Sequence, residues 1–145
     1  MKIYVASSWR NEARQQECVR RLRAEGHEVY DFRNPAPGDH GFGWRQIDPD
    51  PSWLKDPERF RQGLRHPIAE HGFGLDMGAL RECDACVLVL PCGRSAHLEL
   101  GWATGALKHT VVWLDSPLSE PELMYKACNT LCVTLDEVVA DLAGD

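Results

Sequence analysis

The strongest constraint on the fold is the run Ala-Cys-Val-Leu-Val-Leu at residues 85–90, which contains no charged side chain. A short apolar run bounded by Asp84 and Pro91 is typical of a strand that is buried on both faces, as the strands of parallel sheets are. Beyond Pro91, apolar residues recur at helical spacing, at Ala96, Leu100, Ala103 and Leu107. The pattern therefore predicts a buried strand followed by a core-facing helix over residues 95–107, with Ser95 as its N-cap.

Strand and helix patterns alternate along the whole chain. They predict strands over residues 2–6, 27–32, 85–90, 110–114 and 131–133, and helices over residues 12–25, 56–70 with an end or kink at Pro67, 75–82, 95–107, 121–127 and 135–142. Strands that alternate with helices run parallel, because each return needs a crossover. The sequence thus predicts an α/β fold: a single-domain flavodoxin-like or Rossmann-like layer of about five parallel strands with helices on both faces.

One long segment, residues 33–55, falls outside this alternation. It is rich in Pro, Gly and Asp and contains Trp44 and Trp53. A loop of this length within a compact domain is usually functional or disordered, and two tryptophans favour order. We therefore expect one domain over residues 1–145, whose insert either covers the sheet edge or forms a lid or an aromatic wall over a ligand.

The overall charge and the apolar pattern exclude several partners. Nucleic acids and anionic membranes usually select a basic surface, whereas this chain has a formal net charge of -6. No apolar run approaches the roughly 20 residues that span a bilayer, and Met1 leads into a predicted strand without the apolar segment of a signal peptide. We expect a cytoplasmic protein that binds neither nucleic acid nor membrane.

The six cysteines do not form a recognisable metal site or disulfide framework. Cys83 and Cys86 form a C-x-x-C across a predicted helix–strand junction, and Cys128 and Cys132 lie four residues apart. No histidine pair with ligand spacing accompanies either set. Reduced thiols that act as small hydrophobic residues are the expectation, with no metal bound.

Polar residues concentrate where the predicted strands end. In open parallel sheets, ligands bind outside the carboxyl ends of the strands. The segments at those ends are residues 7–11, the loop from residue 33, residues 92–99 and residues 115–124. No dinucleotide-binding glycine motif or P-loop is present, and residues 93–97 lack the second glycine of a nucleophile elbow.

The chemistry that remains is that of carboxylates. Two carboxyl groups around one bond are the requirement for glycosidic cleavage, and Glu99 and Asp76 are the candidates. Glu99 falls near the start of a predicted helix, where the helix dipole favours the ionised form of a nucleophilic carboxylate. Donors to a phosphate or to sugar hydroxyls are available at Ser8, Arg10, Arg94 and Ser95.

Each carboxylate also has a structural alternative. Glu99 could be the acid of a capping box, although with Ser95 as the cap that acid would fall on Leu98. Asp76 could cap a helix, and Asp84 could be a turn former at the start of a strand. His97, in the predicted helix, is expected to face solvent.

Four short segments in order carry a family resemblance. They are Tyr4–Asn11 (YVASSWRN), Asp76 to Asp84, Leu98 to Lys108 with its Glu-Leu-Gly core, and Glu122–Tyr125 (ELMY). On these segments the chain resembles the nucleoside 2-deoxyribosyltransferase superfamily, and within it the 2'-deoxynucleoside 5'-phosphate N-hydrolases. The resemblance implies a flavodoxin-like fold, no cofactor or metal, and a homodimer or higher homo-oligomer whose sites are shared between subunits.

The resemblance also implies roles for single residues. Glu99 would be the nucleophile on the anomeric carbon, Asp76 the acid that faces the nucleobase, and Tyr4 the residue that orients Glu99. The substrate-binding residues would be Ser8, Arg10, Gly93, Arg94, Ser95, Glu122 and Met124. At Glu122 the family usually has Asn or Ser, and an ionised glutamate there would repel a phosphate.

The leading hypothesis is therefore an enzyme that cleaves, or transfers across, the N-glycosidic bond of a nucleoside or nucleoside 5'-monophosphate. The reaction would pass through a glycosyl-enzyme intermediate on Glu99. Two alternatives stay open: a nucleotide-binding sensor without catalytic turnover, and a TIR-like NAD glycohydrolase, which also uses a helical glutamate.

Overall fold

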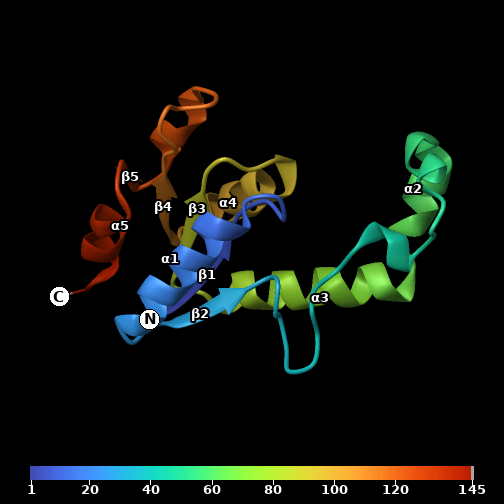
Figure 1. The fold of residues 1–145 in the computed structure, drawn as a ribbon, viewed down its shortest axis with the longest axis horizontal. Helices are drawn as coiled ribbons and strands as arrows, with labels where there is room; N and C mark the ends of the chain where they lie inside the picture. The colour runs from blue at the N-terminus through green and yellow to red at the C-terminus, as the bar shows by residue number, and fades with distance from the viewer. Residues whose placement is uncertain (145) are drawn as a thin grey trace. The chain divides into compact units, whose positions relative to one another are not determined.

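A computed structural model describes residues 1–144 and shows a single five-stranded sheet (Figure 1). All neighbouring strands are parallel and their order is β2-β1-β3-β4-β5. The strands are β1 (Lys2–Ala6), β2 (Glu28–Asp31), β3 (Ala85–Val89), β4 (His109–Trp113) and β5 (Thr130–Cys132). This is the flavodoxin order, so the predicted fold class is confirmed.

The part of the chain that the structure describes also contains five α-helices and three short 3₁₀ helices, of which all but the last α-helix lie between strands. The α-helices are α1 (Glu12–Ala24), α2 (Pro57–Gly63), α3 (Pro67–Glu82), α4 (Arg94–Gly105) and α5 (Leu135–Leu142). The 3₁₀ helices are η1 (Trp44–Gln46), η2 (Pro51–Lys55) and η3 (Leu123–Ala127). No helix within residues 1–144 is long and apolar enough to cross a membrane.

The chain divides into two compact units. The sheet unit comprises residues 1–31 and the chain from Leu80 onward, and the insert unit comprises Phe32–Ala79. The sheet unit contains all five strands together with α1, α4 and α5.

Successive side chains of each strand point to opposite faces of the sheet, so both faces present apolar side chains. Helices cover both faces. On one face Ile3, Val5 and Val87 pack in a single core with α1 and α5 (Figure 1). On the other face α4 packs on β1, β3 and β4, and its buried side chains are Ala96, Leu100 and Ala103. Burial of each large aliphatic side chain is worth about 1.5–3 kcal/mol, which makes these two layers the main source of stability.

The insert unit has its own small aromatic cluster. The Trp44 ring lies edge-on to three others, with centroid distances of 5.0 Å to Phe42, 5.9 Å to Trp53 and 5.5 Å to Phe60. Trp53 is only 3% exposed and lies against Gly63 of α2. The two tryptophans that stood out in the sequence are therefore packed together.

The longest helix of the insert unit differs from the prediction. The sequence predicted that Pro67 ends or kinks a helix and that a second helix begins near Leu75, whereas α3 runs unbroken over Pro67–Glu82. Proline is well suited to the first turn of a helix, where its missing N–H would have no partner. Pro67 therefore begins α3.

The start and end of α4 also differ from the prediction. Gly93, not Ser95, occupies the N-cap position, and the helix ends at Gly105. Leu107, which was expected in the core, is 92% exposed and has a positive φ of 62°. The helix predicted over residues 56–70 ends early, because α2 stops at Gly63, and the helix predicted over residues 121–127 is the shorter 3₁₀ helix η3. The predicted strand 2–6 and helix 135–142 match β1 and α5.

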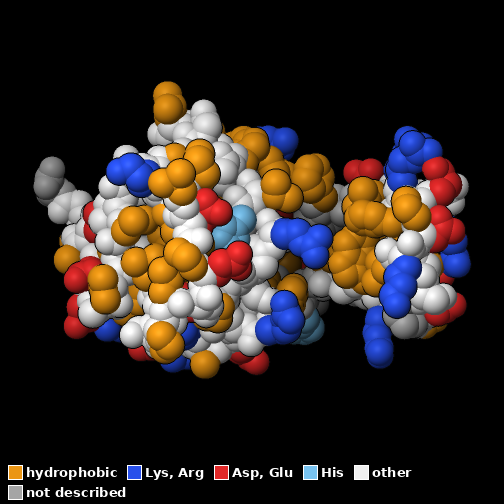
Figure 2. All heavy atoms as spheres, turned by 90° about the horizontal axis from the view of Figure 1, so that it is seen from above, with side chains coloured by type: hydrophobic (Ala, Val, Ile, Leu, Met, Phe, Trp, Pro, Cys, Tyr) orange, Lys and Arg blue, Asp and Glu red, His pale blue; other side chains and the backbone are white. Residues whose placement is uncertain are grey.

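The six cysteines are free thiols, and four of them are buried. Several large hydrophobic side chains, in contrast, lie on the surface. Figure 2 shows hydrophobic side chains gathered among charged ones on the face that it draws.

Candidate active site at the carboxyl ends of the strands

Two loops that follow neighbouring strands are tied together by hydrogen bonds. The Ser7 hydroxyl after β1 donates to the carbonyl oxygen of Val89 over 2.8 Å. The Asn11 amide donates to the carbonyl oxygen of Pro91 over 3.1 Å. The β1–α1 turn and the β3–α4 loop are therefore held side by side at the carboxyl edge of the sheet.

Glu99 lies inside α4 and is not a helix cap. Because Gly93 is the N-cap, Glu99 is the sixth helical residue, whereas a capping box would place its acid at the third, Ala96. The capping-box alternative is therefore wrong. Glu99 is half-buried and follows Ala96 by three residues, so it lies beside the stripe of α4 that packs on the sheet.

The thiols around Glu99 show where its charge acts. Burial raises the pKa of Cys86 on β3 well above its usual value, and the negative charge of Glu99 contributes to the rise. Burial likewise raises the pKa of Cys92 to about 12, with the charges of Glu99 and Asp115 adding to it. The charge of Glu99 therefore acts on one thiol of β3 and on one thiol of the loop that follows it.

Tyr4 lies on the same face of the sheet as Cys86. The two residues are opposite each other in the β1–β3 register, and Tyr4 is fully buried. Its ring stacks on Tyr30 of β2 at a centroid distance of 5.1 Å. Tyr4 therefore lies beside a buried thiol whose pKa the charge of Glu99 helps to raise, while the predicted orienting role of Tyr4 stays a prediction.

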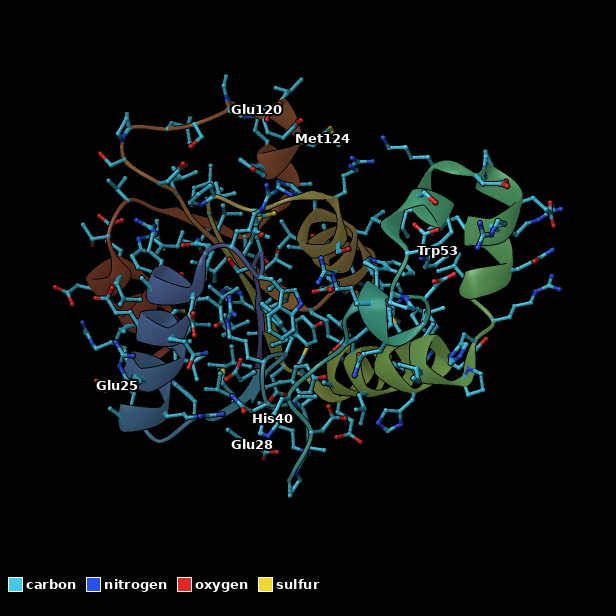
Figure 3. All side chains as sticks on the ribbon, turned by 45° about the vertical axis from the view of Figure 1, so that its right-hand side comes forward. Glu25, Glu28, His40, Trp53, Glu120 and Met124 are labelled. Carbon is cyan, nitrogen blue, oxygen red and sulfur yellow. The ribbon has the colours of Figure 1, made fainter. Side chains whose placement is uncertain are left out.

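An open pocket of about 510 Å³ lies beside the β3–α4 loop. One side is this loop with the start of α4, and the other is the segment between β4 and β5. Glu120 and Met124 project from that second segment (Figure 3). The pocket is lined by Leu90, Pro91, Cys92, Gly93, Arg94, His97, Asp115, Ser119, Glu120, Glu122 and Tyr125.

The charged side chains of the pocket lining are mostly acidic. Asp115, Glu120 and Glu122 are its carboxylates, and Arg94 is its arginine. The Asp115 carboxylate accepts hydrogen bonds from the backbone N–H and the hydroxyl of Ser119. The Glu122 carboxylate caps η3 by accepting from the N–H of Met124 over 2.7 Å. Such a lining favours an uncharged polar or cationic group over a phosphate.

The sequence predicted that His97 faces solvent, but the structure places its side chain between two hydrogen-bond partners. Its Nδ1 lies 2.7 Å from the carbonyl oxygen of Gly93, and its Nε2 lies 2.8 Å from the hydroxyl of Tyr125. The imidazole also stacks on the Tyr125 ring, with centroids 5.8 Å apart. Tyr125 is 28 residues away in the sequence, and no local pattern indicates such a contact.

Cys92 and His97 are close but do not form a nucleophile–base pair. The Cys92 sulfur lies 3.7 Å from His97 Nδ1. A thiol with a pKa of about 12 is almost entirely protonated at neutral pH. Because Nδ1 is already engaged with the carbonyl oxygen of Gly93, it is not available as a base.

The other predicted site residues lie at separate points. The Ser8 hydroxyl accepts from the N–H of Arg10 over 3.2 Å within the β1–α1 turn. Ser95 is an exposed residue of the first turn of α4, and Met124 is 68% exposed on η3. Gly93, Arg94 and Glu122 line the pocket, as described above.

Asp76 and Asp84 have different surroundings. Asp76 is half-buried on α3 in the insert unit, and its pairing with Glu99 stays a prediction. Asp84 accepts the backbone N–H of Lys2 over 2.7 Å, so its side chain has a structural role, but through a long-range bond to β1 and not within a turn as expected. Within residues 1–144, no three His, Cys, Asp or Glu side chains are grouped so that they could hold a metal ion.

Comparisons with known proteins identify the fold. No family model and no curated protein matches the sequence. Among solved structures, the chain is similar to a 2-deoxyribosyltransferase from the psychrotolerant bacterium Bacillus psychrosaccharolyticus, described as a biocatalyst for the synthesis of antiviral and antitumoral nucleosides. The TM-score is 0.56 at 19% sequence identity, and the match covers 95% of this chain and 90% of that chain. The two proteins share a fold over nearly their whole length.

Proposed function

We propose that the protein cleaves or transfers the N-glycosidic bond of a nucleoside or nucleoside 5'-monophosphate, with Glu99 as the nucleophile. The observation that carries the proposal is a half-buried carboxylate inside α4, whose negative charge helps to raise the pKa of Cys92 at the carboxyl edge of the sheet. That edge is where open parallel sheets bind their ligands. The fold shared with a 2-deoxyribosyltransferase gives further support.

The proposed reaction has two displacement steps. An oxygen of Glu99 forms a bond to C1' of the sugar while the C1'–N bond breaks through an oxocarbenium-like transition state. Asp76 gives a proton to the departing base, and Tyr4 orients the Glu99 carboxylate. In the second step Asp76, now deprotonated, takes a proton from water or from the nitrogen of a second base. That oxygen or nitrogen bonds to C1' as the bond between C1' and Glu99 breaks, which completes hydrolysis or transfer and restores both carboxyl groups.

The pocket beside the β3–α4 loop supports a substrate whose sugar end carries no phosphate. A phosphate in the pocket would lie near three carboxylates. Against them Arg94, and Arg10 from the β1–α1 turn, supply only two positive charges, so the repulsion would exceed the attraction. We therefore propose nucleosides as better substrates than their 5'-monophosphates. The proposed contacts to the sugar end are Ser8, Arg10, Gly93, Arg94, Ser95, Glu122 and Met124.

A homo-oligomer with shared sites belongs to the same proposal. Leu98 and Leu123 are each 75% exposed, and Met124 is 68% exposed. These side chains flank His97 and Tyr125, which are in contact. An exposed apolar patch next to a pocket is typical of a surface that a second protein chain covers.

The test is base release from a panel of nucleosides and their 5'-monophosphates, followed by liquid chromatography. Wild-type protein should release base faster from nucleosides, and Glu99→Ala and Glu99→Gln should abolish release from both. Glu12→Gln, at an exposed position in the first turn of α1, is the matched control and should behave as wild type. Full activity in Glu99→Gln would contradict the proposal.

A further inference from the structure

One imidazole connects the two walls of the pocket. His97 contacts Gly93, which precedes α4, and Tyr125, which belongs to η3 on the opposite wall. The first wall leads into the helix that carries Glu99, and the second carries Glu120 and Glu122. The relative position of the two walls therefore depends on this side chain.

The hydrogen-bond partners of His97 determine which of its ring nitrogens carries the proton. A carbonyl oxygen can only accept, so Nδ1 of His97 carries the proton and donates it to Gly93 over 2.7 Å. Nε2 is then the acceptor, and the Tyr125 hydroxyl donates to it over 2.8 Å. Burial, together with the nearby Cys92 and carboxylates, raises the pKa of Tyr125 to about 12, so the phenol keeps the proton that it donates.

Tyr125 is well suited to anchor its wall. It is 7% exposed, while its neighbours Leu123 and Met124 are largely exposed. Tyr125 is thus the side chain through which η3 is packed into the protein, and its hydroxyl is bonded to His97.

We propose that His97 is a positioning residue that holds the pocket at one width for the sugar end of the substrate. This inference rests on the proposed glycosidic activity. Because Glu99 is held within α4 by the packing of Ala96, Leu100 and Ala103 on the sheet, loosening the opposite wall should weaken substrate binding more than it slows the chemistry. The expected signature is a raised KM with a nearly unchanged kcat.

Three substitutions test the proposal on a nucleoside substrate. His97→Phe keeps an aromatic ring for stacking and loses both hydrogen bonds, and Tyr125→Phe loses only the bond to Nε2. Each should raise KM by about tenfold, because loss of the part-buried bond between His97 and Tyr125, with one partner left behind, accounts for such a factor. The value of kcat should fall less than about threefold. His97→Gln, whose amide can still accept from Tyr125, should recover most of the wild-type KM.

The outcomes separate this inference from the proposed function. If wild-type protein releases no base, both fail. If wild type is active and Glu99→Ala is not, while His97→Phe and Tyr125→Phe have the wild-type KM, the positioning role alone is overturned. A loss of kcat at constant KM would also overturn it. Should His97→Phe not fold, as judged by circular dichroism, the more conservative Tyr125→Phe and His97→Gln decide the result.

Discussion

The pKa of the Cys92 thiol depends in part on the charge of Glu99. Burial accounts for most of the rise of its pKa to about 12, and the negative charges of Glu99 and Asp115 add to it. Glu99→Gln removes one of these charges, so the pKa of Cys92 should fall and its thiolate fraction at pH 9 should rise. We expect severalfold faster alkylation of Cys92 by iodoacetamide, measured by peptide-resolved mass spectrometry.

Cys18 is an internal reference for that experiment. Its pKa is also about 12, but its causes are burial and the charges of Glu17 and Arg14, not that of Glu99. Its alkylation rate should therefore be the same in wild type and Glu99→Gln. Equal rates at Cys92 in both proteins would mean that the Glu99 carboxylate does not face the β3–α4 loop.

Some residues of the pocket could be located from the sequence, and others could not. Strand and helix patterns placed the segments of Gly93, Arg94 and Glu122 at the carboxyl edge of the sheet, and these three residues line the pocket. The role of Glu99 stays a prediction. The connection between His97 and Tyr125 was not predicted, because it joins residues 28 apart through side chains alone. Sequence periodicity locates an edge of the sheet but not the hydrogen bonds across it.

Among the helices, α2 and α3 contain glycines with opposite environments. A Cβ on Gly63 would lie 2.5 Å from the buried Trp53 ring, whereas a Cβ on Gly74 would meet nothing within 4 Å. Gly63→Ala should lower the free energy of unfolding by about 1–3 kcal/mol, as overpacking does. Gly74→Ala should raise it by roughly 0.5–1 kcal/mol, because alanine favours a helix interior.

Urea unfolding followed by tryptophan fluorescence measures both effects. The two variants introduce the same methyl group, so each is the matched control of the other. A Gly63→Ala protein as stable as wild type would mean that Trp53 does not press on α2.

The error in predicting α3 has a physical cause at the same scale. Proline is typical both of the end of one helix and of the first turn of the next, so Pro67 is ambiguous without its surroundings. Gly72, Gly74 and Gly78 further weaken the helical pattern of that stretch. By contrast, β1 and α5 contain regular apolar patterns, and their bounds were predicted correctly.

At the scale of the whole molecule, the exposed apolar side chains predict self-association. Leu98, Trp102 and Met124 are 75%, 38% and 68% exposed, and a stable interface needs roughly 800 Å² from each partner. Wild type should have the mass of two copies by light scattering after gel filtration. Leu98→Lys should give one copy, because a charge in the centre of an apolar contact is costly.

Val133→Lys is the matched control for the interface. Val133 is 63% exposed and follows β5, at the other edge of the sheet from β2. The same change there should leave the mass unaltered. A wild-type protein with the mass of one copy at micromolar concentration would contradict the homodimer.

The strand order has a consequence for how the chain is made. β1 lies between β2 and β3. Its edge towards β3 therefore stays unpaired until the ribosome has synthesised residues 32–84 and reached β3. At about 5–20 residues per second, this takes roughly 3–10 s on the ribosome. During that interval the nascent chain presents the unpaired edge of an almost entirely apolar strand, the kind of segment that aggregates or recruits a chaperone.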